Sequence, residues 1–315
     1  MKVLMFHFVR PLPDVHYPEL KSRSVTELVQ QVRYVVDSGE HVWSIPELLE
    51  RTSSGGNVPD DGWLLTFDDG LRDHRAYVMD VLCNEGIKGA FFVPGYPIVE
   101  EKTLRVQKIQ IIFASGCPSA EVLATTQNFL SERLSKDAFH ACLASVSAGV
   151  AAFRSPDDRV TAQAKYLLQN ALPARDMAVL IDKLLESANC AVDPDLHANL
   201  YLSPGEVVEL SQAGHFVGLH GMMHERYASM GDDEAQKDVA LSIAALEEIG
   251  IDCSQTAIAY PYGSVPEASV LRSLKDLGVQ IGFTTKARSA IPDDDWLQLP
   301  RWDTNDFFPT PRYGY

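Results

Sequence analysis

Two acidic residues and two histidines are the side chains of this 315-residue chain whose types and spacing most clearly suggest chemistry. Asp68 and Asp69 are adjacent and are followed by Gly70, whereas three residues separate His220 from His224. Two imidazoles and one carboxylate leave coordination positions of Zn²⁺ open, which is typical of catalytic rather than structural zinc sites. These residues therefore predict a catalytic metal centre.

The spacing within each pair sets conditions on this prediction. Residues four apart lie on one face of a helical turn, so we expect His220 and His224 to point the same way. Neighbours in an extended chain point to opposite sides, so both aspartates can serve one site only if the chain turns, which Gly70 permits. Two plainer interpretations stay open. The aspartates merely begin the next helix, whose dipole favours acidic residues, or the histidines are unrelated.

The positions of these residues depend on the elements that carry them. Strand-like and helix-like segments alternate over residues 1–95 and again from 203 onward, and short loops join them. Such repeated units favour an α/β fold with a parallel sheet, and about seven strands over this length favour a closed or nearly closed (β/α) barrel. In a parallel barrel the carboxyl ends of all strands meet at one face. Predicted strands end just before His7, Asp68, His220, Pro261 and Asp303.

Residues 97–200 break this rhythm, because their pattern is almost wholly helical. We interpret them as a helical insertion, with residues 1–96 and 201–315 forming the barrel. An insertion after a barrel strand emerges at the face where the βα loops gather, so we expect it to cap the substrate cleft. The alternative is a separate helical bundle that has no role at the site.

Composition narrows the class of protein. Lys and Arg number 27 against 43 Asp and Glu, and the net charge of −16 argues against a nucleic-acid binder. No segment approaches the roughly 20 apolar residues of a membrane span, and the first residues look like a strand rather than a signal peptide. The five cysteines are widely spaced without a C-x-x-C pair, as in a reduced, cytosolic protein. We therefore expect a cytoplasmic localisation.

Three motifs resemble those of a known family. The segment Thr66-Phe67-Asp68-Asp69-Gly70 is similar to the first motif of the polysaccharide deacetylases, the NodB-homology group called carbohydrate esterase family 4. Residues 220–224 resemble its metal-binding motif, and Ala259-Tyr260-Pro261-Tyr262-Gly263 resembles its third motif. The likeness spans roughly residues 1–95 and 203–305. Within the family, it is most similar to deacetylases associated with bacterial surface-polysaccharide or O-antigen biosynthesis.

The resemblance implies a distorted (β/α)7 barrel and a zinc-dependent hydrolase that removes an N-acetyl or N-formyl group from an amino sugar. Asp68 would be the general base. Asp69, His220 and His224 would bind Zn²⁺ or another divalent transition metal, and the backbone N–H of Tyr262 would help to form the oxyanion hole. A lipid-linked or nucleotide-linked saccharide, as a precursor of a surface glycan, is the implied substrate.

The chain departs from the family pattern at the general acid. Most members carry that histidine in a late Leu-x-His motif, and none follows residue 263 here. Some members have a permuted motif order with the acid near the N-terminus, and the segment Leu4-Met5-Phe6-His7 fits that arrangement. The resemblance therefore assigns the acid role to His7. The alternative is an ordinary barrel histidine, which is also our interpretation of His74 and His215.

Two further departures concern the residues that support the base and the metal. The arginine that usually precedes the proline of the third motif and holds the base is absent. We expect Arg301 to pair with Asp68 instead, and Asp303 to orient His7; surface or structural salt bridges are the alternative for both. Gly221 stands where a serine or threonine usually follows the first metal-binding histidine.

Fold and motif do not determine substrate. Two other functions therefore stay open beside the sugar deacetylase. One is a hydrolase of small non-sugar amides on the same barrel. The other is a relative that binds glycan without turning it over, which the departures around the base suggest.

Overall fold

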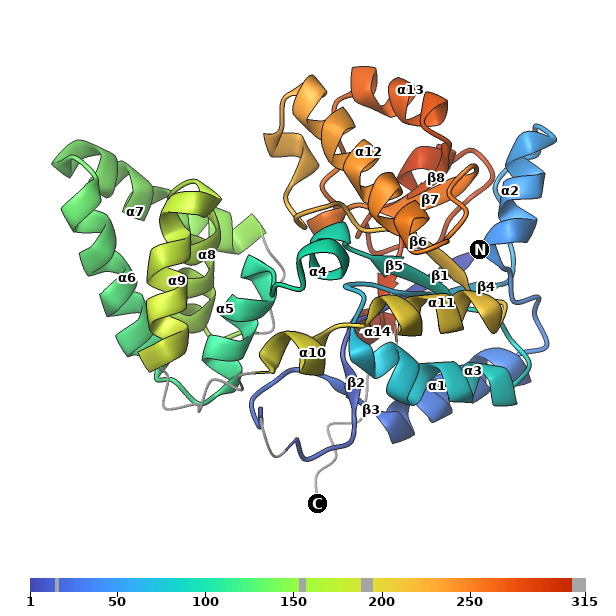
Figure 1. The fold of residues 1–315 in the computed structure, drawn as a ribbon, viewed down its shortest axis with the longest axis horizontal. Helices are drawn as coiled ribbons and strands as arrows, with labels where there is room; N and C mark the ends of the chain where they lie inside the picture. Colours follow the sequence, from blue (N-terminus) through green and yellow to red (C-terminus); the bar gives the residue numbers. More distant parts are fainter. Residues whose placement is uncertain (15–16, 153–156, 188–194, 308–315) are drawn as a thin grey trace. The chain divides into compact units, whose positions relative to one another are not determined.

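The computed structural model describes residues 1–14, 17–152, 157–187 and 195–307, and these divide into two compact units. The first unit comprises residues 1–12, 22–102 and those from 197 onward, and the second comprises residues 13–21 and 103–196. Most of the segment predicted as a helical insertion lies in the second unit, which also takes in residues 13–21. Figure 1 shows both units, coloured along the sequence.

The first unit is built on a sheet of seven parallel strands that curls into an open barrel surrounded by helices, as predicted (Figure 1). The strand order is β8-β7-β6-β5-β4-β1-β9. Nearly every residue of the central strands is buried, because helices cover the outer face of the sheet and side chains fill the inside of the barrel. The strands are β1 Lys2–Phe6, β4 Trp63–Phe67, β5 Ala90–Val93, β6 Phe216–Leu219, β7 Thr256–Ala259, β8 Val279–Phe283 and β9 Trp302–Asp303.

The segment 299–303 joins the two edges of this sheet. Leu299 donates its N–H to the carbonyl of Gly282 at 2.7 Å and accepts the N–H of Thr284 at 2.8 Å, beside β8. Three residues later β9 begins, and it pairs in parallel with β1. The sequence predicts a last strand at residues 297–302, but a short helical turn occupies residues 296–298, Leu299 forms an isolated bridge with Phe283, and β9 comprises only Trp302 and Asp303. Arg301 lies within this closing segment and is 1% exposed.

Helices follow most of the strands, and their starts obey the sequence signals. The Ser24 side chain accepts the N–H of Glu27 at 3.1 Å, and Glu27 accepts the N–H of Ser24 at 2.8 Å, so the predicted capping box is confirmed. A π-helical turn at His74–Val78 precedes α3. The helices are α1 Val25–Asp37, α2 Ile45–Ser53, α3 Met79–Asn84, α4 Gly95–Glu100, α10 Leu196–Leu200, α11 Pro204–Gln212, α12 Asp232–Glu248, α13 Ala268–Asp276 and α14 Thr304–Phe307.

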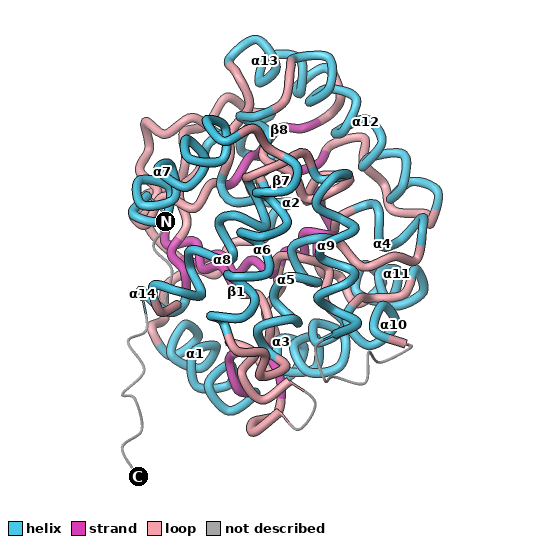
Figure 2. The backbone as a smooth tube through the Cα atoms, turned by 90° about the vertical axis from the view of Figure 1, so that its left-hand side faces the viewer, coloured by secondary structure: helices cyan, strands magenta, loops and turns pink. Residues whose placement is uncertain are grey.

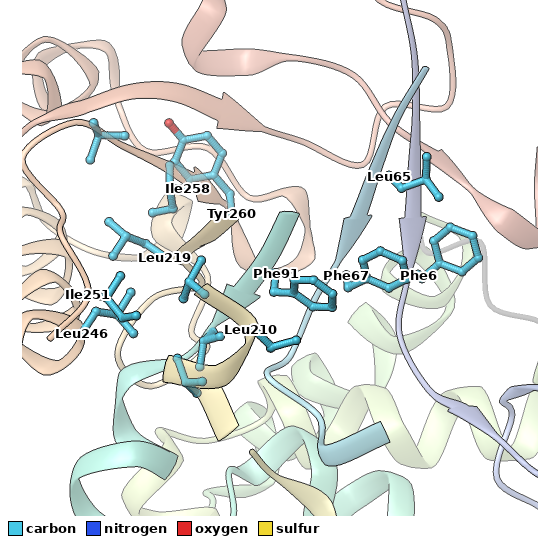
Figure 3. Close-up of a cluster of buried hydrophobic side chains, with 14 of the residues drawn as sticks. Phe6, Leu65, Phe67, Phe91, Leu210, Leu219, Leu246, Ile251, Ile258 and Tyr260 are labelled. Atoms are coloured by element: carbon cyan, nitrogen blue, oxygen red, sulfur yellow. The ribbon is translucent and has the colours of Figure 1, made fainter. Parts of the chain in front are cut away.

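A row of phenylalanines from three neighbouring strands lies directly beneath the carboxyl ends of those strands (Figure 3). The rings of Phe6 and Phe67 stack with centroids 4.9 Å apart, and those of Phe67 and Phe91 stack at the same distance. The three residues are partners in the strand register. Phe6 and Phe67 each end a strand, so His7 and Asp68 emerge at the same level of the barrel.

The second unit is helical in its described part, and Figure 2 shows its helices in cyan. Asp158 begins α8 by accepting the N–H groups of Val160 and Thr161. Lys21 forms an ion pair with Asp157, which ties residues 13–21 to this unit. The helices are α5 Arg105–Ala114, α6 Ser119–Arg133, α7 Lys136–Ala152, α8 Arg159–Asn170 and α9 Ala174–Ser187. The role of these helices as a cap over the cleft stays a prediction.

Two sequence-based expectations concern features outside the site. Among the described residues, no helix combines the length and the apolar character needed to cross a membrane. Cys83, Cys117, Cys142 and Cys253 are free thiols, while Cys190 lies outside the described residues.

A second, two-stranded sheet also belongs to the first unit; it consists of β2 Val9–Arg10 and β3 Arg23–Ser24.

Candidate active site

Asp69, His220 and His224 converge at the carboxyl ends of β4 and β6. The Nε2 atoms of both histidines lie 3.3 Å from Oδ1 of Asp69, and the three ligand atoms lie within 4.8 Å of one another. All three residues are buried, with exposures of 3%, 2% and 7% in chain order. The structure thus brings together the three side chains that the sequence assigned to one metal centre.

The donor atoms of this cluster fit a divalent metal ion. His220 donates its Nδ1–H to the carbonyl of Ala259 at 2.7 Å, so its Nε2 carries the lone pair that a metal binds. Oδ1 of Asp69 is buried and has no hydrogen-bond partner, although it faces both imidazoles. Burial opposes ionisation of Asp69, but the imidazoles of His220 and His224 close to its carboxylate outweigh it and hold the pKa of this carboxyl well below its usual range.

The backbone that presents these side chains is unusual. Only four non-glycine residues of the described chain have positive φ, and three of them are in the site: Asp69 at 75°, His224 at 54° and Tyr262 at 59°. Each such residue costs on the order of 1–3 kcal/mol and persists only where its surroundings impose it. The strain lies where the chain must turn its side chains toward one point.

The predicted helical turn between the two histidines is wrong. Residues 220–226 form a loop, and Gly221 at φ 71° and His224 at φ 54° reverse the chain within it. The two imidazole centroids lie 4.8 Å apart as a result of this reversal rather than of helical spacing. The turn predicted at Gly70 is present, with φ 60° there and φ 75° at Asp69.

Asp68 and Arg301 form the pair that was expected from their positions at strand ends. Arg301 donates to Oδ1 and Oδ2 of Asp68 at 2.8 and 2.7 Å, which is a two-bond contact of the strong kind. It also donates to the hydroxyl of Thr66 and, through Nε, to the carbonyl of Thr284, both at 3.0 Å. Four N–H groups of the guanidinium are therefore bound, and the side chain is fixed beside the carboxylate.

The electrostatics of Asp68 follow from this pairing. Complete burial would raise the pKa of Asp68, but the positive charge of Arg301, and next that of His220, lowers it below the ordinary value. Asp68 is therefore ionised at neutral pH despite being 2% exposed. A buried carboxylate held by one arginine can accept a proton from a molecule that approaches its open side.

His7 follows β1, next to Asp68, whose N–H bonds the carbonyl of Phe6 at 3.0 Å. Its backbone is held by side chains at the start of the π-helical turn. His74 donates Nε2–H to the carbonyl of His7 at 3.1 Å, and Asp73 accepts the N–H of Val9 at 3.2 Å. Burial lowers the pKa of His74 to about 4, so His74 is a neutral donor. The sequence offered no indication of this role.

Asp303 and Tyr262 complete the set of predicted site residues. Oδ1 of Asp303 accepts the backbone N–H and the side-chain amide N–H of Asn305, both at 2.7 Å, at the start of α14, and its role in orienting His7 stays a prediction. The ring of Tyr262 lies 4.8 Å from that of His224, and the guanidinium of Arg226 lies 4.0 Å from the Tyr262 ring centre. Tyr262 is thus placed at the edge of the metal centre.

Comparison with protein families gives one match. Residues 176–282 match the model of the polysaccharide deacetylase family. This stretch contains the two histidines and the third motif, whereas the fold brings in the Asp68-Asp69 pair from outside it. The resemblance predicted from the motifs is thereby confirmed. No protein with a curated function matches the sequence.

Solved structures share the fold at low sequence identity. The deacetylase PplD of Streptococcus pyogenes, solved in complex with acetate, has a TM-score of 0.57 and 15% identity over 96% of this chain and 91% of that chain. IcaB from Ammonifex degensii has a TM-score of 0.55 and 17% identity over 96% and 90%. A de-N-acetylase from Aggregatibacter actinomycetemcomitans has a TM-score of 0.53 and 12% identity over 100% and 96%.

Proposed function

Because this chain matches the polysaccharide deacetylase family and has the fold of solved deacetylases, we propose that it is a metal-dependent hydrolase that removes an N-acetyl or N-formyl group from an amino sugar. The observation that carries the proposal is the buried Asp69, His220 and His224 cluster with the ionised Asp68 beside it. We further propose that the substrate is a lipid-linked or nucleotide-linked precursor of a bacterial surface glycan.

The residues divide the work of amide hydrolysis among them. Asp69, His220 and His224 would hold Zn²⁺ or a similar ion, which supplies Lewis acidity that polarises the acyl oxygen and makes a water molecule more acidic. Asp68 takes a proton from this water as its oxygen attacks the acyl carbon. Arg301 keeps Asp68 ionised and aimed, because it binds both carboxylate oxygens.

The later steps need a donor for the developing oxyanion and a proton for the leaving amine. The backbone N–H of Tyr262 would be this donor, and loss of such a donor costs about 100- to 1,000-fold in rate. His7 then gives a proton to the nitrogen as the C–N bond breaks. The products are a carboxylic acid and the free amino sugar.

A release assay tests this function. Purified protein loaded with Zn²⁺ would be incubated with N-acetylhexosamines linked to nucleotides, N-acetylhexosamines linked to lipids, and N-acetylated oligosaccharides, and acetate would be quantified. We expect acetate release from at least one of them, its loss with chelator, and its loss in Asp68→Asn. Asp60→Asn is the matched control, because Asp60 is exposed.

Other outcomes would select the other functions. Turnover of small non-sugar amides alone would replace the proposal with a general amidohydrolase. Bound zinc with no turnover of any amide would favour a glycan-binding protein.

A further inference from the structure

The loop between the two histidines is held from two sides. On one side, Gly95 and Tyr96 at the start of α4 donate their N–H groups to the carbonyls of Gly221 and Met222 at 3.0 and 2.9 Å. On the other side, Asp238 of α12 accepts the N–H of Met222 at 3.0 Å. The reversed chain from 220 to 224 thus lies between two helices, each of which bonds its backbone.

Asp238 also fixes the chain beyond the second histidine. Its Oδ1 accepts the hydroxyl of Tyr227 at 2.5 Å. Asp238 is 8% exposed and Tyr227 is 1% exposed, so water does not compete for these bonds. One carboxylate oxygen therefore ties Met222, which lies between the histidines, to Tyr227, which lies three residues past His224.

This contact would crowd any side chain at position 221. At Gly221, a Cβ atom would lie 3.3 Å from both Oδ1 of Asp238 and the hydroxyl of Tyr227, on a backbone at φ 71°. Asp238 bonds the same loop from the neighbouring helix.

We propose that Asp238 is a positioning residue for the metal centre, which holds the loop in the one conformation that brings His220 and His224 together at Asp69. This inference rests on the proposed metal centre but not on the identity of the substrate. A metal site needs its ligands held within about 0.5 Å of the productive geometry. Loss of the residues that orient metal ligands typically lowers metal affinity by about 10- to 100-fold.

The test measures Zn²⁺ affinity without catalysis. Metal-free wild-type protein, Asp238→Leu, Asp238→Asn and Tyr227→Phe would be titrated against a chromophoric chelator, and the thermal midpoint of each metal-free protein would be recorded. Asp233→Leu is the matched control, because Asp233 lies on the same helix and is exposed. Cobalt substitution would report ligand geometry through its visible spectrum.

We expect Asp238→Leu to weaken Zn²⁺ binding by at least about tenfold. Asp238→Asn keeps an acceptor oxygen, so we expect it to restore most of the affinity, while Asp233→Leu binds as the wild type does. A variant that melts earlier but binds Zn²⁺ as tightly as the wild type would show that Asp238 is only structural, and would overturn the inference.

If Asp238→Leu fails to fold, Tyr227→Phe decides. This variant removes one of the two donors to the carboxylate and should weaken binding and alter the cobalt spectrum; wild-type behaviour in both would overturn the inference. Failure of the wild-type protein to bind Zn²⁺ at all would instead refute the proposed metal centre. The two failures are therefore distinguishable.

Discussion

Replacing Arg301 with methionine removes a buried charge and leaves its partner behind. The substitution deletes two bonds to Asp68, one to Thr66 and one to Thr284. The arginine side chain is 0% exposed, so water does not replace these partners. Breaking a buried ion pair by removing one member costs about 3–5 kcal/mol. We expect Arg301→Met to lower the free energy of unfolding by that amount and to abolish deacetylation.

The unfolding of the first unit can be followed separately from that of the second unit. All four tryptophans, Trp43, Trp63, Trp296 and Trp302, lie in the first unit, so urea unfolding of the metal-free protein followed by tryptophan fluorescence reports on the barrel. The matched control is Arg33→Met, because that side chain is 64% exposed and its pairing with a glutamate should contribute less than about 1 kcal/mol.

A double variant tests the physical reason for this loss. Asp68→Asn combined with Arg301→Met leaves no buried charge from the pair. We expect it to be more stable than Arg301→Met alone by roughly 1 kcal/mol or more, because removal of both partners is far less costly than removal of one. A single variant that loses under about 1 kcal/mol, or a double variant no more stable than the single one, would refute the reasoning.

Three further predictions concern the metal, the general acid and pH. Excess Zn²⁺ should raise the melting temperature of the wild type by several degrees, since a ligand at a thousand times its Kd adds about 4 kcal/mol, and a calorimetric scan should show no rise for Asp69→Asn. The variant His74→Leu should lower kcat for amide hydrolysis more than kcat for aryl-ester hydrolysis, because the leaving group of an aryl ester needs no proton from His7. The variant His74→Gln should keep the wild-type ratio of these two kcat values. Burial lowers the pKa of His215 from 6.5 to about 4, so His215 binds a proton in the unfolded chain before it does in the folded one, and the free energy of unfolding falls as the pH drops from about 6.5 to 4. The variant His215→Asn keeps an acceptor for the Gly89 N–H but does not titrate. Urea unfolding should therefore show a shallower loss of stability with falling pH for this variant, by up to about 1.4 kcal/mol per pH unit.

The strands and the convergence of their carboxyl ends could be predicted because the burial of a strand can be recognised from its residue types. Parallel strands covered on both faces are continuous apolar runs, and the polar residue after each run marks the carboxyl end of the sheet. This rule placed Asp68 and His220 at one face, and it placed Arg301 close enough to pair with Asp68. The pairing of Arg301 with Asp68 was expected from this position together with the absence of the arginine that usually holds the base in the resembled family.

The loops could not be predicted, because their conformations are imposed by contacts remote in sequence. Helical spacing of His220 and His224 was a reasonable expectation, but bonds from α4 and Asp238 hold that segment in a reversed form. The positive φ values of Asp69 and Tyr262 are likewise unfavourable locally. No propensity rule assigns a left-handed conformation to a tyrosine.

Supporting side chains were missed for a related reason. His74 bonds a carbonyl 67 residues away, and a histidine that serves as a neutral donor in a core carries no motif. The position of Asp303 at a strand end predicted a partner at His7, but it gave no indication of the bonds that Oδ1 accepts from the nearby Asn305. Local hydrogen bonds of this kind compete with any long-range role.

The segment 299–303, which joins the two edges of the sheet, has a consequence for the order in which the site residues are synthesised and brought together. Asp68 is translated 233 residues before Arg301, the residue that binds its carboxylate, and Arg301 lies in the segment that carries the last strand of the sheet. During synthesis, the metal ligands can therefore all be present while the base still lacks its counter-charge. The ion pair between Asp68 and Arg301 therefore forms only after residues 299–303 have joined the sheet beside β8 and β1.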